Sequence, residues 1–175
     1  HCPEIEFRNV SFRYPSRSEY ALRNVNLCIA PRDHVAVVGE NGAGKSTFVK
    51  LLLRLYDVTE GEILVDGRNI KDYPYDEYMN LFSTVFQDFI IFIYSAEENI
   101  GFDRVEKARL ETAMKKAGIY ECIERLPRRG KTILGKRYDS EGVDLSGGEK
   151  QKVAIARALY KDAPVAVLDE PTAAL

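Results

Sequence analysis

The chain has 175 residues, and its 25 lysines and arginines nearly balance its 27 aspartates and glutamates, for a formal net charge of −2. Phosphate-driven nucleic-acid binding needs a surplus of Lys and Arg on one face, so this balance argues against a nucleic-acid partner. The longest uninterrupted apolar stretch, residues 89–94, is far shorter than the roughly 20 residues of a membrane-spanning helix. We therefore expect a single domain that does not itself cross a membrane.

Cys2, Cys28 and Cys122 are far apart and form no CxxC or Cys/His cluster. Such an odd, scattered set predicts neither a disulfide framework nor a zinc site and is typical of a reducing, cytosolic compartment. The sequence has no initiator Met, and its last residues, 171–175, directly follow an apolar run. We expect the chain to be a piece of a longer protein.

The first elements are predicted as strands. Apolar residues at positions 5, 7, 10 and 12, and again at 25, 27 and 29, nearly alternate with polar ones, as in half-buried antiparallel strands. Residues 34–38 are continuously apolar and predict a buried strand that ends at Gly39. A Gly-rich turn then leads into a helix with apolar positions 48, 51, 52 and 55. Further short strands are expected at 62–65 and 83–86.

From about residue 103 the periodicity becomes helical. Helices are predicted over 105–117, ended by Gly118, and over 120–126, ended by Pro127. A polar loop at 136–144 precedes a helix that includes 153–159, and 165–168 reads as a buried strand. We therefore expect a core lobe formed by 1–88 and 161–175, with a mainly parallel core sheet, and a helical lobe formed by 89–160.

The sequence GENGAGKST matches the phosphate-loop pattern GxxxxGK[ST] and lies between a predicted strand and a predicted helix. Glycines within it allow backbone conformations that other residues avoid, so successive N–H groups can converge on phosphate oxygens at the helix N-terminus. The lysine would reach the β- and γ-phosphates, and the serine hydroxyl would bind Mg²⁺. The alternative is a Gly-rich helix start without a ligand. The predicted ATP-binding residues of this loop are Gly39, Glu40, Asn41, Gly42, Ala43, Gly44, Lys45, Ser46 and Thr47.

The predicted strand 165–168 ends in Asp169 and Glu170, which is the Walker B pattern. In this pattern the aspartate holds Mg²⁺ directly or through water. Glu170, one residue further on, can accept the proton of the water that attacks the γ-phosphate. Alone, such an acidic pair is more often a helix cap or a solvated strand end, but the phosphate loop in the same chain favours the catalytic interpretation.

A second glycine-rich segment, LSGGE, precedes the predicted helix that includes 153–159. Its serine hydroxyl and glycine N–H groups could form another anion-binding helix N-terminus. Taken alone, SGGE is more often a helix cap in which the glutamate completes a capping box. The segment consists of Leu145, Ser146, Gly147, Gly148 and Glu149.

Together, the phosphate loop, Gln87 after a strand, LSGGE and VAVLDEP resemble the nucleotide-binding domain of ATP-binding cassette (ABC) transporters. The resemblance covers almost the whole chain, since VSFRYP, VFQD and SEGVDLSGGEKQKVAIARAL match in order, and the chain ends shortly after Walker B. Within the family, YPSR, ALRNVNL and SAEENI are most similar to the exporter type. The resemblance implies an α/β, P-loop NTPase fold: an ABC-type ATPase core with an antiparallel β subdomain and a helical subdomain.

The resemblance also implies roles for individual residues. Tyr14 would stack on adenine, although an isolated strand Tyr is more often a core residue, and Gln87 would link Mg²⁺ and the attacking water to the surface that meets the membrane domain. Ser146, Gly147 and Gly148 would bind the γ-phosphate of ATP held by a second nucleotide-binding domain, so the active unit would be a dimer. The implied catalytic residues are Glu170 and Gln87, and the implied ligands of Mg²⁺ are Ser46, Gln87 and Asp169.

The implied function is ATP binding and hydrolysis coupled to export of a substrate, at the cytoplasmic face of the cell membrane and with a transmembrane domain as partner. Glu149 and Lys150 stand where many exporters have Gln and Arg. The family's switch His and the Asp that completes the loop after Walker B are not in the chain, so we expect the fragment alone to be weakly active or inactive. Two alternatives stay open: a soluble ABC-type ATPase of a DNA-repair or chromosome machine, and a nucleotide switch that does not hydrolyse.

Overall fold

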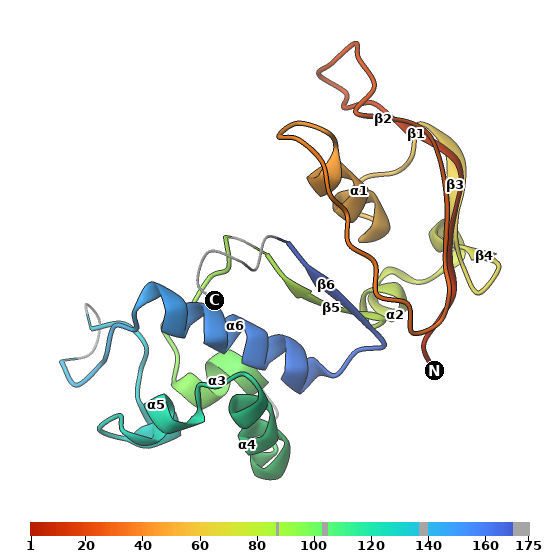
Figure 1. Ribbon diagram of the computed structural model, residues 1–175. Helices are drawn as coiled ribbons and strands as arrows, with labels where there is room; N and C mark the ends of the chain where they lie inside the picture. The colour runs from red at the N-terminus through yellow and green to blue at the C-terminus, as the bar shows by residue number, and fades with distance from the viewer. Residues whose placement is uncertain (87, 103–104, 137–139, 170–175) are drawn as a thin grey trace. The chain divides into compact units, whose positions relative to one another are not determined.

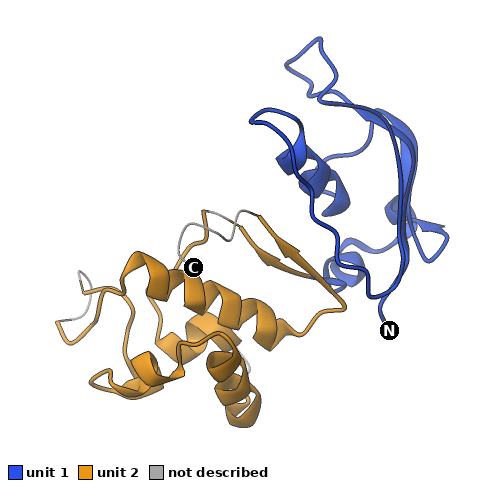
Figure 2. Cartoon of the chain, viewed as in Figure 1, with its two compact units in different colours: residues 1–82 blue, residues 83–175 orange. Residues whose placement is uncertain are grey.

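The computed structural model describes residues 1–86, 88–102, 105–136 and 140–169. The chain divides into two compact units, residues 1–82 and residues 83–175 (Figure 2). We describe each unit by itself. The sequence predicts a core lobe and a helical lobe whose boundaries differ from those of these two units. That division stays a prediction.

Unit 1 contains a four-stranded sheet with the strand order β2-β1-β3-β4 (Figure 1). Every neighbouring pair is antiparallel, which confirms the two strands predicted from the alternation near the start of the chain. The strands are β1 (Ile5–Phe12), β2 (Leu22–Ile29), β3 (Glu60–Val65) and β4 (Arg68–Asn69).

A bulge interrupts the alternation within β1. Its pairing register with β2 shifts between Phe7 and Val10, where Asn9 has a left-handed φ of 48°. The Asn9 N–H donates to the side-chain oxygen of Asn26 at 2.9 Å. Because the extra residue is held by this side chain, Arg8 and Asn9 both face solvent and Val10 returns to the core.

Unit 1 also contains α1 (Lys45–Leu52), the 3-10 turn η1 (Ile70–Asp72) and α2 (Tyr75–Met79). The ring of Phe48 in α1 stacks on Phe7 of β1 with 4.6 Å between centroids. Leu51 is fully buried beside it, while Leu55, predicted to continue the helix, is 48% exposed. The helix therefore packs its apolar face on the sheet and ends at Leu52, three residues earlier than the apolar spacing suggests.

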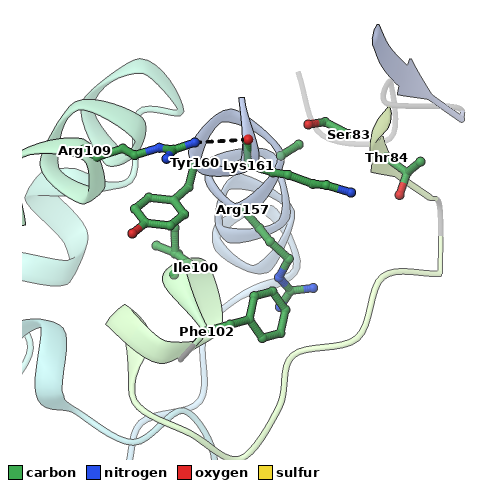
Figure 3. A pocket seen from close by; sticks show the side chains of 10 residues that line it. Ser83, Thr84, Ile100, Phe102, Arg109, Arg157, Tyr160 and Lys161 are labelled. Carbon is green, nitrogen blue, oxygen red and sulfur yellow. Dashed lines mark hydrogen bonds between the residues drawn. The ribbon is translucent and has the colours of Figure 1, made fainter. Parts of the chain in front are cut away.

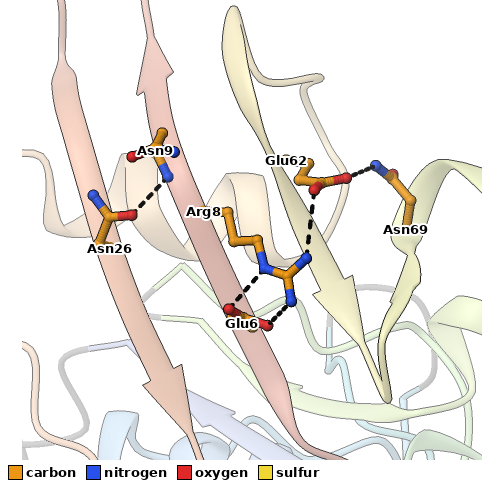
Figure 4. A network of polar contacts seen from close by, with 6 residues as sticks. All are labelled: Glu6, Arg8, Asn9, Asn26, Glu62 and Asn69. Atoms are coloured by element: carbon orange, nitrogen blue, oxygen red, sulfur yellow. Dashed lines mark hydrogen bonds and ion pairs between the residues drawn. The ribbon is translucent and has the colours of Figure 1, made fainter.

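A polar network crosses β1, β3 and β4 (Figure 4). Arg8 donates through Nε and one terminal nitrogen to the carboxylate of Glu6, at 2.7 Å in each case, and its other nitrogen lies 3.8 Å from Glu62. Asn69 donates to the same Glu62 at 3.1 Å. The hydrogen bonds from Arg8 lower the pKa of Glu6. These exposed contacts add little stability, so the buried apolar residues on the sheet must hold unit 1 together.

Residues 34–38 are not a strand, contrary to the sequence prediction. Val35 and Val37 are about half exposed, Val38 is 86% exposed, and no described strand pairs with the segment. An extended segment joins a sheet only through hydrogen bonds to a neighbouring strand. The apolar run indicates a preference for burial, but it does not specify a neighbouring strand that could form these hydrogen bonds.

Unit 2 contains the two-stranded sheet β5-β6 and a group of helices. The strands, near the predicted positions, are β5 (Phe82–Val85), which begins with the last residue of unit 1, and β6 (Val165–Leu168). The longest helix, α6, packs against α3 and α4 (Figure 1). The helices are α3 (Ala96–Gly101), α4 (Lys107–Lys116), α5 (Tyr120–Glu124), the 3-10 turn η2 (Arg129–Lys131) and α6 (Gly147–Lys161).

The end of α4 shows why the predicted helical pattern stops at Gly118. This glycine has a φ of 68°, a conformation that other residues rarely adopt. Its N–H donates to the carbonyl of Lys115, and the N–H of Ile119 donates to the carbonyl of Met114. This pair of bonds is a Schellman motif, and it turns the chain so that Ile119 enters the core of unit 2.

In the part of the chain that the structure describes, no helix is long and apolar enough to span a bilayer.

Candidate nucleotide-binding site

The predicted phosphate loop leads directly into α1 in unit 1 (Figure 1). Gly42 and Gly44 have φ values of 84° and 93°, so both occupy the left-handed region that glycine favours. Gly44 is the N-cap of α1 and no side chain caps the helix, which leaves its first N–H groups available to an anion. The loop backbone thus has the conformations that a phosphate cradle requires.

Lys45 is held by the loop itself. Its ammonium group donates to the carbonyl oxygens of Gly39 and Glu40, at 2.7 and 2.9 Å. These bonds fold the side chain back over the loop, where a phosphate bound at the N-terminus of α1 could compete for the same cation. Ser46, the predicted ligand of Mg²⁺, is exposed at the next position.

Tyr14 and the phosphate loop come together within unit 1. The Tyr14 hydroxyl lies 3.0 Å from the hydroxyl of Thr47, which is 7% exposed. The Tyr14 ring contacts Phe12 and Tyr56 edge-on, with centroids 4.9 and 5.3 Å apart. The half-exposed ring is therefore fixed beside the loop by three side chains, while its stacking on adenine stays a prediction.

Replacing Gly44 by alanine should lower the affinity for MgATP at least tenfold. A Cβ at this position would lie 2.8 Å from both the carbonyl oxygen of Ala21 and the side chain of Leu22. A left-handed conformation costs a non-glycine residue about 1–2 kcal/mol in addition. The control is Gly67→Ala in the turn before β4, where φ is 77° but nothing lies within 4 Å. Titration of both variants with MgATP tests this, and wild-type affinity in Gly44→Ala would contradict it.

Asp169, the first of the two predicted Walker B residues, directly follows β6 in unit 2. The Asp169 N–H donates to the carbonyl of Val85 at 2.9 Å, so the pairing with β5 continues up to this carboxylate. A hydroxyl at position 46 and a carboxylate at 169 are the hard oxygen ligands that Mg²⁺ prefers, so the described donors fit this ion. Gln87 and Glu170 lie outside the described residues.

The LSGGE segment forms the start of α6, and Ser146 is the N-cap. The carboxylate of Glu149 accepts from the N–H of Ser146 at 2.8 Å and from its hydroxyl at 2.7 Å. In return, the Ser146 oxygen accepts from the N–H of Glu149 at 3.4 Å. This is the capping box that SGGE predicts when taken as a helix start. A role in binding the ATP of a partner stays a prediction.

Cys122 extends this capping box, which sequence reasoning did not anticipate. Its thiol, on α5, donates to the second carboxylate oxygen of Glu149 at 3.1 Å. Burial, and then the hydrogen bond to Glu149, raise the pKa of Cys122 to about 11, so the thiol keeps its proton at neutral pH. The hydrogen bonds from Ser146 and Cys122 lower the pKa of Glu149. No local pattern connects two residues on different helices.

Arg157 is a second side chain whose role the sequence did not show (Figure 3). From α6 its guanidinium donates to the carbonyl of Asn99 at 2.8 Å and to that of Ile90 at 3.2 Å. It also lies 5.4 Å from the ring centroids of Phe92 and Phe102. Burial lowers the pKa of this side chain. The sequence feature that could have indicated this role is a single arginine among the buried positions of the amphipathic helix α6.

Arg157 also lines a pocket of about 310 Å³ in unit 2 (Figure 3). Arg109 of α4 closes one side, since its guanidinium donates to the carbonyl of Lys161 at 3.1 Å and lies 5.0 Å from the centre of the Tyr160 ring. None of the described residues that line this pocket is among those predicted to bind nucleotide.

Comparison with known proteins gives one family. The model of the family described as "ABC transporter" matches residues 22–173. The subtilin transport ATP-binding protein SpaT of Bacillus subtilis is 42% identical to this chain over 175 residues, which are 98% of this chain and 28% of that protein. The ATP-dependent lipid A-core flippases of Alkalilimnicola ehrlichii and Escherichia coli (strain K12) are 43% and 41% identical, over 98% of this chain and 29% of each protein.

A solved structure agrees with these relatives. It is described as a bacterial Atm1-family ABC exporter with ATP bound, and it matches with a TM-score of 0.90 and 40% identity over 100% of this chain and 30% of that one. This chain thus spans less than a third of the length of the proteins it matches. The predicted ABC-type, P-loop ATPase fold and the similarity to exporters are confirmed. The chain belongs to the ABC transporter family.

Proposed function

We propose that this chain is the ATP-binding and ATP-hydrolysing domain of an ABC exporter, in which ATP-driven pairing of two such domains and hydrolysis are coupled to export of a substrate across a membrane. The observation that carries the proposal is the phosphate loop, with two left-handed glycines, a lysine folded over it and an uncapped helix N-terminus. The relatives that match along 98% of the chain include ATP-dependent flippases.

In the proposed site, the N–H groups of the loop and of the first turn of α1 bind the phosphates, and Lys45 exchanges its carbonyl partners for phosphate oxygens. Tyr14 stacks on the adenine ring, which fits its half-exposed position beside Thr47. The remaining proposed contacts come from Gly39 to Thr47, the range of the motif.

Ser46, Gln87 and Asp169 would hold Mg²⁺ together with phosphate oxygens and water. When bound, this ion neutralises the charge that develops on the phosphate oxygens. Glu170 would accept a proton from the attacking water, and Gln87 would link Mg²⁺ and that water to the surface that meets the membrane domain. Each of these roles rests on the residue type and on its position in a motif of the family.

Two such domains would pair head to tail, so that Ser146, Gly147 and Gly148 of one domain meet the γ-phosphate of ATP held by the other. A transmembrane domain, on the same chain or on a separate one, would receive the motion at the cytoplasmic face of the membrane. The exposed end of α6 supports this role, because Ser146 and Gly147 are open to solvent at a helix N-terminus. No nucleic-acid partner is proposed, since the chain has no cationic surplus.

The test is to read the native gene on both sides of this segment and to assay the full-length protein. About six apolar segments of membrane-spanning length upstream in the same frame would support the exporter assignment, as would a His-bearing strand downstream. A gene without such segments would favour a separate subunit or a soluble ABC-type ATPase. Steady ATP turnover by the full-length protein is expected, and binding without turnover would instead identify a nucleotide switch.

A further inference from the structure

The side chain of Glu149 is held from two helices. One carboxylate oxygen accepts from the N–H and the hydroxyl of Ser146, at 2.8 and 2.7 Å, and the other accepts from the thiol of Cys122, at 3.1 Å. Ser146 is the N-cap of α6, whereas Cys122 lies on α5, 27 residues before Glu149 in the chain. Both oxygens of the carboxylate are therefore used, and its orientation is fixed.

The same chain contains a capping box without this third contact, at the start of α3. Ser95 donates through its N–H and its hydroxyl to one oxygen of Glu98, and the N–H of Glu98 donates to the Ser95 oxygen at 3.2 Å. Among the described residues, no thiol donates to Glu98. A helix cap thus does not require the contact made by Cys122, and the Ser95–Glu98 pair provides an internal reference for cap stability alone.

The hydroxyl of Ser146 has one proton, and it donates that proton to Glu149. A hydroxyl that donates to a carboxylate at this distance makes a charge-assisted hydrogen bond, roughly twice as strong as a neutral one. A phosphate at the end of α6 would need the same proton. Glu149 therefore competes with any phosphate that Ser146 binds, and its negative charge also opposes the approach of an anion.

We propose that Glu149, oriented by Cys122, is a positioning residue that restrains the Ser146 hydroxyl, so that ATP-driven pairing of two domains requires Ser146 to exchange this carboxylate for the γ-phosphate. The inference rests on the proposed function, in which Ser146 meets the ATP of the partner domain. With a carboxylate at position 149, pairing of the two domains then requires a higher ATP concentration than it would with an amide at that position. The thiol contributes by keeping the carboxylate turned toward Ser146.

The test compares Glu149→Gln with its parent in the full-length protein carrying Glu170→Gln, which is designed to retain ATP. The readout is ATP retained after rapid gel filtration, measured as a function of MgATP concentration. The amide still accepts from the Ser146 N–H, so the cap remains, but it is a neutral and weaker acceptor. We expect the half-saturating MgATP concentration to fall about fivefold. This is the change in equilibrium constant that corresponds to replacing a charge-assisted hydrogen bond by a neutral one.

Glu98→Gln is the matched control, because it makes the same chemical change in the other capping box. It should change the thermal stability as much as Glu149→Gln does and leave the half-saturating concentration unchanged. Cys122→Ala should shift that concentration in the same direction as Glu149→Gln but less, since a thiol is a weak donor. Cys122→Ser, which keeps a donor toward Glu149, should restore the parental value.

The two proposals fail in different ways. If the parent protein retains no ATP at saturating MgATP, the proposed pairing itself is wrong. If the parent retains ATP but Glu149→Gln behaves like the parent, or Glu98→Gln shifts the concentration equally, the restraint on Ser146 is overturned. A shift in the maximal amount of retained ATP, without a shift in concentration, would also contradict it.

Discussion

Replacing Lys45 by alanine should abolish MgATP binding. The carbonyl oxygens of Gly39 and Glu40 accept hydrogen bonds from its ammonium group and so hold this cation over the phosphate loop. Its removal leaves the phosphates to the backbone N–H groups alone and removes a charge-assisted contact that lies close to them. Isothermal titration of the purified protein with MgATP measures the effect directly.

The control for this substitution is Lys50→Ala, which removes the same side chain from the last turn of the same helix. A lysine at a helix C-terminus contributes only a few tenths of a kcal/mol, up to about 1 kcal/mol, through the helix dipole, so its loss should leave the affinity unchanged. Thermal melting of both variants shows whether α1 is intact. Binding by Lys45→Ala with the affinity of the control would refute the phosphate-loop assignment.

Glu170→Gln in the full-length protein should preserve MgATP binding and reduce turnover by about 10²- to 10⁴-fold, the usual contribution of a general base. The amide keeps the size of the side chain but cannot accept the proton of the attacking water. ATP that is bound and not hydrolysed should then hold two domains together. Steady-state phosphate release and ATP retention on the same sample separate chemistry from binding.

Glu77→Gln provides the comparison for Glu170→Gln. Glu77 is an exposed carboxylate in the first turn of α2, outside every motif of the sequence, and its neutralisation should leave turnover unchanged. Turnover close to wild type in Glu170→Gln would exclude this residue as the base. Loss of MgATP binding in Glu170→Gln would mean that it supports the nucleotide rather than the reaction.

The local elements of this protein could be read from the sequence because they are fixed by residues three to five positions apart. The Ser146–Glu149 capping box and the Gly118 turn after α4 are closed by hydrogen bonds of this range. The alternation that predicted β1 and β2 reflects a face of the sheet that must be buried, and Phe7 is buried as expected.

Other features depend on neighbours that no local pattern specifies. The apolar run 34–38 predicted a buried strand, yet it is exposed and no described strand pairs with it, and a strand exists only through hydrogen bonds to another strand. Residues 170–175 and 87, which carry two of the predicted catalytic groups, lie outside the described part of the chain. Their roles are inferred from motif position and not from geometry.

The sequence by itself determined the family of the chain, its phosphate loop and its helix caps, because these depend on residue type at short, fixed spacing. Only the tertiary structure decided that Cys122 holds Glu149 across 27 residues and that Arg157 holds the carbonyl of Ile90 across 67. Such contacts arise when packing of the helices in unit 2 brings distant segments together. Their energies depend on burial, which the order of residues alone does not reveal.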